Sequence, residues 1–166
     1  MSLVDPDNRR PVNFAARAKR LGALETPDWA PLVEKWRNGE LKFAWTRHLL
    51  KLRAERAELF TFGDYQPLEV SGPHREHIIA FARRRGREVA ITVVAKAFAP
   101  FTQAGRVLPR IESFEAAVDL QGFALDGVNP GSGELPVSLL FKHLPVAVLK
   151  ARTAMSPKRS LQRVSG

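Results

Sequence analysis

The sequence of 166 residues contains no cysteine and no long apolar run. Without cysteine, disulfide bonds and thiolate chemistry are excluded. No apolar stretch approaches the roughly 18 residues that a membrane-spanning helix requires. Residues 1–20 carry charges throughout, in place of the apolar centre of a signal peptide. We therefore expect a soluble protein of the cytoplasm with no membrane partner.

Acidic residues are also scarce, because 17 Asp and Glu accompany 26 Lys and Arg and leave a formal net charge of +9. Such an excess is typical of nucleic-acid-binding proteins when it gathers on one surface. Here residues 150–166 hold five basic residues and no acid, and subtracting these five charges leaves +4 for residues 1–149. The run RRRGR at residues 83–87 lies between two strand-like stretches, so we interpret it as the solvated turn of a hairpin.

Apolar residues make up 45% of the chain, which is enough for one buried core. Residues 14–24 show the apolar spacing of a helix. A second helix is predicted to begin at Pro27, with Thr26 as its N-cap, to carry Trp29 and Trp36 on its apolar face, and to end at Asn38-Gly39. The third, over residues 41–59, has apolar side chains at three- and four-residue intervals, and basic residues such as Arg47 are expected to face solvent.

From residue 63 onward the apolar period falls to two, between turns rich in Gly and Pro. Antiparallel strands are predicted over residues 67–71, 77–83, 88–96, 108–113, 116–120, 123–125 and 145–149, with a short helix over 137–144 and a hairpin around the Arg-rich turn. The predicted class is α+β: an N-terminal helical segment of about three helices (residues 1–62) packed on a small antiparallel β-sheet or sandwich (residues 63–149). Residues 150–166 are expected to form a basic disordered tail.

Few side chains suggest a catalytic centre or a metal site. His74 and His77 have the spacing of neither a zincin nor a zinc finger, so we interpret them as surface histidines and expect no metal and no cofactor. Residues 131–133 (Gly-Ser-Gly) lack the context of a nucleophile elbow and are interpreted as a loop. Glu55 and Glu58 lie beside basic residues on the third helix, where solvated ion pairs are the ordinary explanation.

The first residues contain a dense polar cluster, VDPDNRRPVNF at residues 4–14. Residues 5–8 (Asp-Pro-Asp-Asn) fit a turn that caps the following helix. The two adjacent arginines add more than a cap requires, because guanidinium donors together with Asp and Asn acceptors suit a hydroxyl-rich ligand. These residues alone leave both interpretations open.

Two further stretches follow the opening cluster: LKFAWTRHLLKLRAERAELF at residues 41–60 and GDYQPLEVSGPHREHIIAFARRRG at residues 63–86. In this order and at this spacing, the three stretches resemble the C-terminal part of the malto-oligosyltrehalose synthases, a family of the α-amylase clan. The similarity continues through LPVAVL at residues 144–149.

The resemblance implies an isomerase of trehalose biosynthesis, which converts the reducing-end α-1,4 bond of a malto-oligosaccharide into an α,α-1,1 bond by intramolecular glucosyl transfer with retention. Retention requires two opposed carboxyl groups, which this clan holds on a (β/α)8 barrel of roughly 250 residues. We therefore expect no catalytic residue here and no activity of the chain alone. By the same resemblance Asp7, Asn8, Arg9 and Arg10 follow the last barrel strand and bind or brace the sugar in the intact enzyme.

Three hypotheses follow. The first is a C-terminal fragment or truncated paralogue, which meets malto-oligosaccharide through the intact enzyme and is completed by a barrel-containing partner chain or by self-association. The second is a non-catalytic glucan-binding module, because Trp29, Trp36 and Trp45 can stack on sugar rings, although their amphipathic spacing favours the core. The third, a nucleic-acid-binding protein, rests on charge alone and is ranked last.

Overall fold

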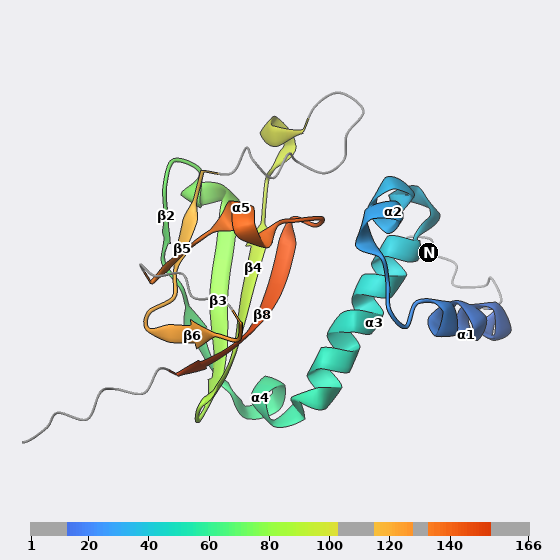
Figure 1. The fold of residues 1–166 in the computed structure, drawn as a ribbon, viewed down its shortest axis with the longest axis horizontal. Coiled ribbons are helices and arrows are strands. Elements are labelled where there is room, and N and C mark those ends of the chain that lie inside the picture. Colours follow the sequence, from blue (N-terminus) through green and yellow to red (C-terminus); the bar gives the residue numbers. More distant parts are fainter. Residues whose placement is uncertain (1–12, 103–114, 128–132, 154–166) are drawn as a thin grey trace, which may run out of the picture.

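The computed structural model describes residues 13–102, 115–127 and 133–153. Helices occupy the first part of the chain and two antiparallel sheets the rest, which confirms the predicted α+β class (Figure 1). Within these ranges, no helix has both the length and the apolar character that a bilayer crossing requires. The division into domains at residues 62 and 63 stays a prediction.

The N-terminal segment consists of α1 (Phe14–Ala23), α2 (Trp29–Glu34), α3 (Glu40–Glu55) and α4 (Ala57–Phe62), with a 3-10 turn at Trp36–Asn38. Two of these helices begin at side-chain caps. Asn13 Oδ1 accepts a hydrogen bond from the Ala16 N–H at 2.9 Å, and Asp28 Oδ1 accepts one from the Ala30 N–H at 3.3 Å. The prediction of Thr26 as N-cap was therefore wrong by two residues, because the Asp28 carboxylate supplies the acceptor.

The third predicted helix, residues 41–59, is two helices in the structure. α3 ends at Glu55, and Arg56 departs from helical geometry with φ −131° before α4 begins. The break redirects the chain, so that α4 packs on β3 and β4 of the sheet described below. Leu59 of α4 is fully buried, with 0% of its surface exposed.

The joint between α4 and the sheet depends on Gly63. A Cβ atom added at Gly63 would collide with the carbonyl oxygen of Leu59. Arg83 Nη1 donates to the Gly63 carbonyl oxygen at 2.7 Å, and Arg85 forms an ion pair with Glu58 at 2.5 Å. The Arg-rich run forms the exposed end of a hairpin as predicted, with residues 84–87 exposed, but Arg83 is half-buried and binds the chain at Gly63. The ion pair of Glu58 is solvated as predicted, but its partner, Arg85, lies on the sheet and not on the helix.

The larger sheet has the order β1-β3-β4-β8-β6 and the smaller the order β2-β5-β7, with every neighbouring pair antiparallel. The strands are β1 (Asp64–Pro67), β2 (Val70–Ser71), β3 (Ile78–Arg85), β4 (Glu88–Ala95), β5 (Ala117–Asp119), β6 (Phe123–Leu125), β7 (Glu134–Pro136) and β8 (Val146–Thr153). Further 3-10 turns occur at Arg75–His77 and Ala99–Phe101, and α5 (Val137–Leu140) precedes β8. The short helix predicted over 137–144 thus ends four residues early.

The hairpin predicted from residues 77–83 and 88–96 is confirmed. Arg85 lies opposite Glu88 at its end, and Gly86 adopts φ +58° in the turn. This left-handed conformation favours glycine because it has no Cβ.

Other strand predictions needed correction. The single strand predicted over residues 67–71 is two strands in different sheets, because the chain crosses from one sheet to the other where Leu68 is buried between them. β8 continues to Thr153, so the first four residues of the segment 150–166, which we expected to be disordered, are paired with β4 and β6. The strand predicted over residues 108–113 lies outside the described residues.

The hydrophobic core lies between the two sheets. β4 contributes Val89, Ile91 and Val93, which are fully buried at alternating positions of the strand. The smaller sheet, α5 and the adjoining loops contribute Val118, Leu120, Leu135, Val137 and Phe141. The inner face of the larger sheet is therefore closed, whereas α4 covers only one end of its outer face.

Leu59→Ala is expected to lower the free energy of unfolding by about 2–5 kcal/mol, because it removes a fully buried side chain and leaves a cavity. Leu50→Ala is the control, since Leu50 is 59% exposed, and its effect should stay within about 0.5 kcal/mol. Urea unfolding followed by circular dichroism measures both. Equal effects would contradict the role of Leu59 as the contact that holds α4 on the sheet.

Candidate interaction groove between α3 and β8

The outer face of the larger sheet carries two rows of mainly apolar side chains. The strand register places Ile79, Val94 and Val146 side by side in the first row. The second row consists of Phe81, Thr92 and Val148. Ile79 is 44% exposed and the other five are half-buried. Since residues two apart on a strand share a face, the rows form one surface across three strands.

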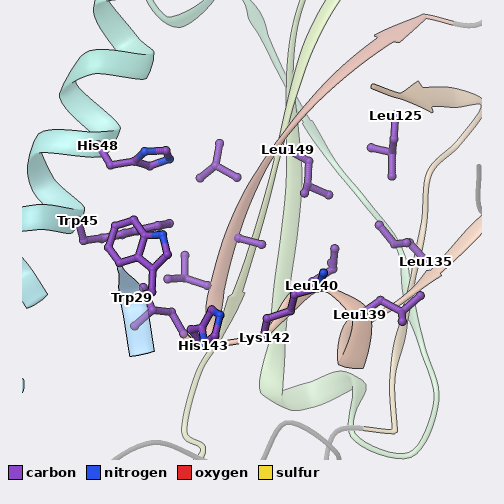
Figure 2. A pocket seen from close by; sticks show the side chains of 14 residues that line it. Trp29, Trp45, His48, Leu125, Leu135, Leu139, Leu140, Lys142, His143 and Leu149 are labelled. Atoms are coloured by element: carbon purple, nitrogen blue, oxygen red, sulfur yellow. The ribbon is translucent and has the colours of Figure 1, made fainter. Parts of the chain in front are cut away.

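An aromatic cluster on α2 and α3 faces this sheet (Figure 2). The rings of Trp29 and Trp45 meet edge to face with centroids 5.4 Å apart, and His48 stacks on Trp45, also at 5.4 Å. Arg47 ties α3 to the end of α1, because its Nη1 donates to the Leu24 carbonyl oxygen at 2.6 Å. Arg47 is half-buried, so the prediction that it faces solvent was wrong.

Between the aromatic cluster and β8 lies a groove of about 530 Å³, which we call the α3–β8 groove (Figure 2). Its aliphatic lining consists of Leu125, Leu135, Leu139, Leu140, Leu144 and residues 146–149. The polar lining is limited to His48, Lys142 and His143 and the indole N–H groups of the two tryptophans. The groove is therefore apolar, with basic groups at its border.

The groove continues towards the C-terminal end of α3 as a second cavity of about 290 Å³, which shares His48 and Val148 with the first. There Glu55 Oε2 lies 3.9 Å from Lys150 Nζ, and Lys51 also lines the cavity. We predicted that Glu55 pairs with basic residues of its own helix, but it pairs with β8. Both side chains are about half exposed, so the pair contributes little to stability.

The chemistry of the groove favours an apolar occupant. The lining of the larger cavity contains no carboxylate, amide or hydroxyl side chain. Sugars are bound through such groups, because each hydroxyl that loses water needs a hydrogen-bond partner. A retaining glycosyl transfer needs two carboxyl groups about 5 Å apart. The groove therefore suits a protein surface better than a sugar or a reacting bond.

The structure brings two of the three tryptophans together. Trp29 and Trp45 are half-buried against each other, whereas Trp36 lies apart and is 37% exposed, with the Arg37 guanidinium 5.1 Å from its ring centroid. The part played by His48 was missed. Its spacing of three residues from Trp45 was the available signal, but the sequence does not show which face of α3 meets the sheet.

The residues predicted to bind sugar are Asp7, Asn8, Arg9 and Arg10, and all four lie outside the described residues. Residues 131 and 132 of the loop interpreted as Gly-Ser-Gly also lie outside them. The prediction of a sugar site in the opening cluster therefore stays a prediction.

His74 and His77 have structural roles. His74 Nδ1 accepts a hydrogen bond from the Glu115 backbone N–H at 3.0 Å, and His77 Nδ1 donates to the Ala97 carbonyl oxygen at 3.1 Å. Both rings meet Phe101 edge to face. The two histidines are half-buried and lie just before β3, so they are at the surface near the start of a strand as predicted, but their rings are fixed by these contacts. Throughout the part of the chain that the structure describes, no group of three or more His, Asp or Glu could hold a metal ion.

The fold and the groove define a class of protein segment, in which helices are joined to a two-sheet antiparallel unit and an apolar groove lies between them. Comparison with known proteins gives the particular relationship, which is to the maltooligosyltrehalose synthases. Proteins from two strains of Mycobacterium tuberculosis, provisionally named maltooligosyl trehalose synthases, are 34% identical over 151 residues, which cover 89% of this chain and 17% of theirs.

The solved structures agree with this relationship. Maltooligosyltrehalose synthase from Arthrobacter ramosus superposes with a TM-score of 0.63, and a point mutant of it with 0.64. Both are 33% identical to this chain, and the match covers 90% of this chain and 18% of theirs. No family model matches the chain. The chain is thus homologous to a segment of maltooligosyltrehalose synthase and spans less than a fifth of the length of these relatives.

Val148→Asp is expected to remove most of the fluorescence of an apolar dye such as anilinonaphthalene sulfonate bound to the chain, because Val148 lines both cavities of the groove and such dyes report exposed apolar surface. Leu50→Asp is the matched control, since Leu50 is exposed outside the groove lining. Maltoheptaose should leave tryptophan fluorescence unchanged. A saturable response to the sugar, or equal dye signals for both variants, would contradict an apolar binding groove.

Proposed function

We propose that the chain is the C-terminal, non-catalytic part of a cytoplasmic maltooligosyltrehalose synthase. The enzyme converts the reducing-end α-1,4 bond of a malto-oligosaccharide into the α,α-1,1 bond of a trehalose end. One observation carries the proposal: the identity of 33–34% extends over 89–90% of this chain but over only 17–18% of its relatives. Helices and sheets alike are thus related to one segment of a much longer enzyme.

The size and architecture of the chain support a non-catalytic role. A retaining transfer needs a nucleophile and an acid/base on opposite sides of the bond. A barrel that could hold them takes roughly 250 residues, whereas this chain has 166. The described residues form helices and antiparallel sheets. In this proposal the chain supplies support and substrate contacts, and the barrel-containing part supplies the chemistry.

The substrate contacts in this proposal come from Asp7, Asn8, Arg9 and Arg10. Arginine offers several fixed donors and aspartate offers acceptors, which together match the alternating hydroxyl groups of a glucose unit. Such a cluster needs a rigid surface to position it. The barrel-containing part provides that surface in the assembled enzyme.

The purified chain is expected to form no trehalose-ended product from maltopentaose. A chimera of the Arthrobacter ramosus enzyme, in which this chain replaces the matched segment, is expected to form it. Chromatography of the products after incubation measures both. Product from the chain alone would contradict the non-catalytic assignment, and a folded but inactive chimera would contradict the relationship in function.

Arg9→Ala and Arg10→Ala in the same chimera are each expected to lower kcat/KM for maltopentaose by about 10-fold or more, the loss expected for a charge-assisted hydrogen bond of roughly 1.5–3 kcal/mol. Arg87→Ala is the control, because Arg87 is exposed beside the hairpin turn. Steady-state kinetics measure the ratio. If all three variants behave alike, the opening cluster does not contact the sugar.

A further inference from the structure

We propose that the free edge of β8 is a site for strand addition, at which a separate protein inserts an extended segment with an apolar centre and acidic ends. This contact is independent of the proposed function. β6 pairs with β8 only at residues 151–153, and the Asp126 N–H extends the contact by one hydrogen bond to the Lys150 carbonyl oxygen. Among the described residues, no strand pairs with this edge of β8 at residues 146–149, which line the α3–β8 groove.

The backbone of β8 has hydrogen-bonding groups to offer at this edge. In an antiparallel ladder, residues that bond to one neighbouring strand alternate with residues that bond to the other. The Thr153 N–H bonds to the Arg87 carbonyl oxygen on the β4 side, and the Lys150 carbonyl oxygen accepts its bond on the β6 side. The N–H and C=O groups of Val146 and Val148 therefore point to the free edge, where the described residues provide no partner. An added antiparallel strand can bond to both groups of each valine.

The α3–β8 groove lies where such a strand would run. Four consecutive residues of β8, 146–149, line the groove, and consecutive side chains of a strand point to opposite faces of the sheet. The aromatic cluster lines the groove on the outer side, whereas Leu135 belongs to the core and Leu140 packs against it (Figure 2). The cavity of about 530 Å³ is therefore open to both faces of the sheet and lies beside the strand edge itself.

The neighbours of the free edge determine the centre of the inserted segment. Residues directly opposite each other share a face of the sheet, so side chains paired with Val146 and Val148 would meet the aromatic cluster. The side chains between them would meet Leu139, which is 58% exposed, and Leu140. Both environments are apolar, and a strand that is covered on both faces is apolar throughout. The central residues of the segment are therefore aliphatic.

The charges at the two ends of the free edge select acidic ends for the segment. Lys142 and His143 line the groove before β8 begins, and Lys150 follows the free stretch directly, with Lys51 beside it in the smaller cavity. The one acidic side chain in the lining of either cavity, Glu55, is 3.9 Å from Lys150. Carboxylates at both ends of the segment would therefore meet complementary charge.

The basic charge of the chain disfavours two other occupants. Residues 154–166, which follow β8, contain Lys158, Arg159 and Arg163 and no acidic residue, so they would bring like charge to the same lysines. A second copy would pair β8 with β8 and would bring together two chains with a formal net charge of +9 each. The segment is therefore assigned to a different, acidic partner, and the experiment tests for a second copy.

Isothermal titration calorimetry of the full chain measures binding of the capped peptide acetyl-Asp-Glu-Val-Leu-Val-Leu-Glu-Asp-amide. The chain should bind it saturably, and added salt should weaken the binding. A peptide with lysine at all acidic positions should bind about 10-fold more weakly or worse. N-methylation of the central residues should have an effect of similar size, because it keeps the side chains and removes the N–H donors of the strand. Equal binding of the methylated peptide, or no binding of the parent peptide, would overturn the proposal.

Val148→Pro removes an N–H from the free edge and leaves the ladder to β4 in place, because proline is tolerated where the N–H of a strand faces away from its neighbour. It should weaken binding of the parent peptide about 10-fold or more, whereas Val148→Thr, which keeps the N–H, should bind like the wild type. Equal binding by the two folded variants would contradict strand addition. If circular dichroism shows that Val148→Pro unfolds the chain, the methylated peptide decides the question on the wild type.

The second copy and the assembled enzyme are tested separately. A wild-type dimer in size-exclusion chromatography that Val148→Pro dissociates would overturn the proposal, because the edge would then hold a second copy. The Arthrobacter ramosus chimera should also bind the parent peptide, since the partner has to reach the edge in the enzyme. Product formation without peptide binding by the chimera would leave the proposed function standing and overturn strand addition, and peptide binding without product would do the reverse.

Discussion

The strands β3, β4 and β8 carry apolar side chains on both faces, and both faces must be kept from water. A sheet that is apolar on one face alone can leave the other face exposed. Here the smaller sheet covers the inner face and completes the core around Ile91 and Val93. The outer face is covered at one end by α4, where Leu59 is fully buried. The remaining outer surface needs a further layer.

The joint at Gly63 determines where that layer can lie. Because the Gly63 backbone passes close to the Leu59 carbonyl oxygen and is bound by Arg83, α4 is fixed against the sheet. α3 precedes α4 by a single non-helical residue, Arg56, so the direction of α3 follows from that of α4. The result is a helix that lies near the sheet at one end and leaves the α3–β8 groove at the other. A local packing contact thus produces a candidate interaction site.

Much of the fold could be predicted, because local patterns dictate it. The alternation in residues 77–96 and the Gly in its turn identified the hairpin, and apolar spacing identified the helices of the first 60 residues. The helix break at Arg56 contains no Gly or Pro, so the local sequence does not predict it, and directly after the break Leu59 is fully buried. The split of strand 67–71 likewise depends on the second sheet, which the local pattern does not contain.

The groove was harder to predict, because its residues come from separate elements. The sequence predicts that Val148 belongs to an apolar strand, but an apolar run does not show which of its side chains face the core. We predicted solvated positions on one helix for Arg47, Glu55 and Glu58. In the structure, the groups that bind these side chains lie in other parts of the fold. Long charged side chains can bind across an element boundary while their stems pack on apolar surface. Only the three-dimensional arrangement assigns those partners.

The excess of basic over acidic residues bears on the outer face of the larger sheet. Excess charge of one sign opposes the association of identical molecules, and this chain carries a formal charge of +9. The rows on that face include Ile79, Val94 and Val146, which are β-branched residues that fit a strand whether or not a partner covers them. Lys51, Lys142 and Lys150 line the cavities beside the β8 end of these rows. Part of the basic excess therefore lies next to apolar surface, and the charge alone does not indicate a nucleic-acid partner.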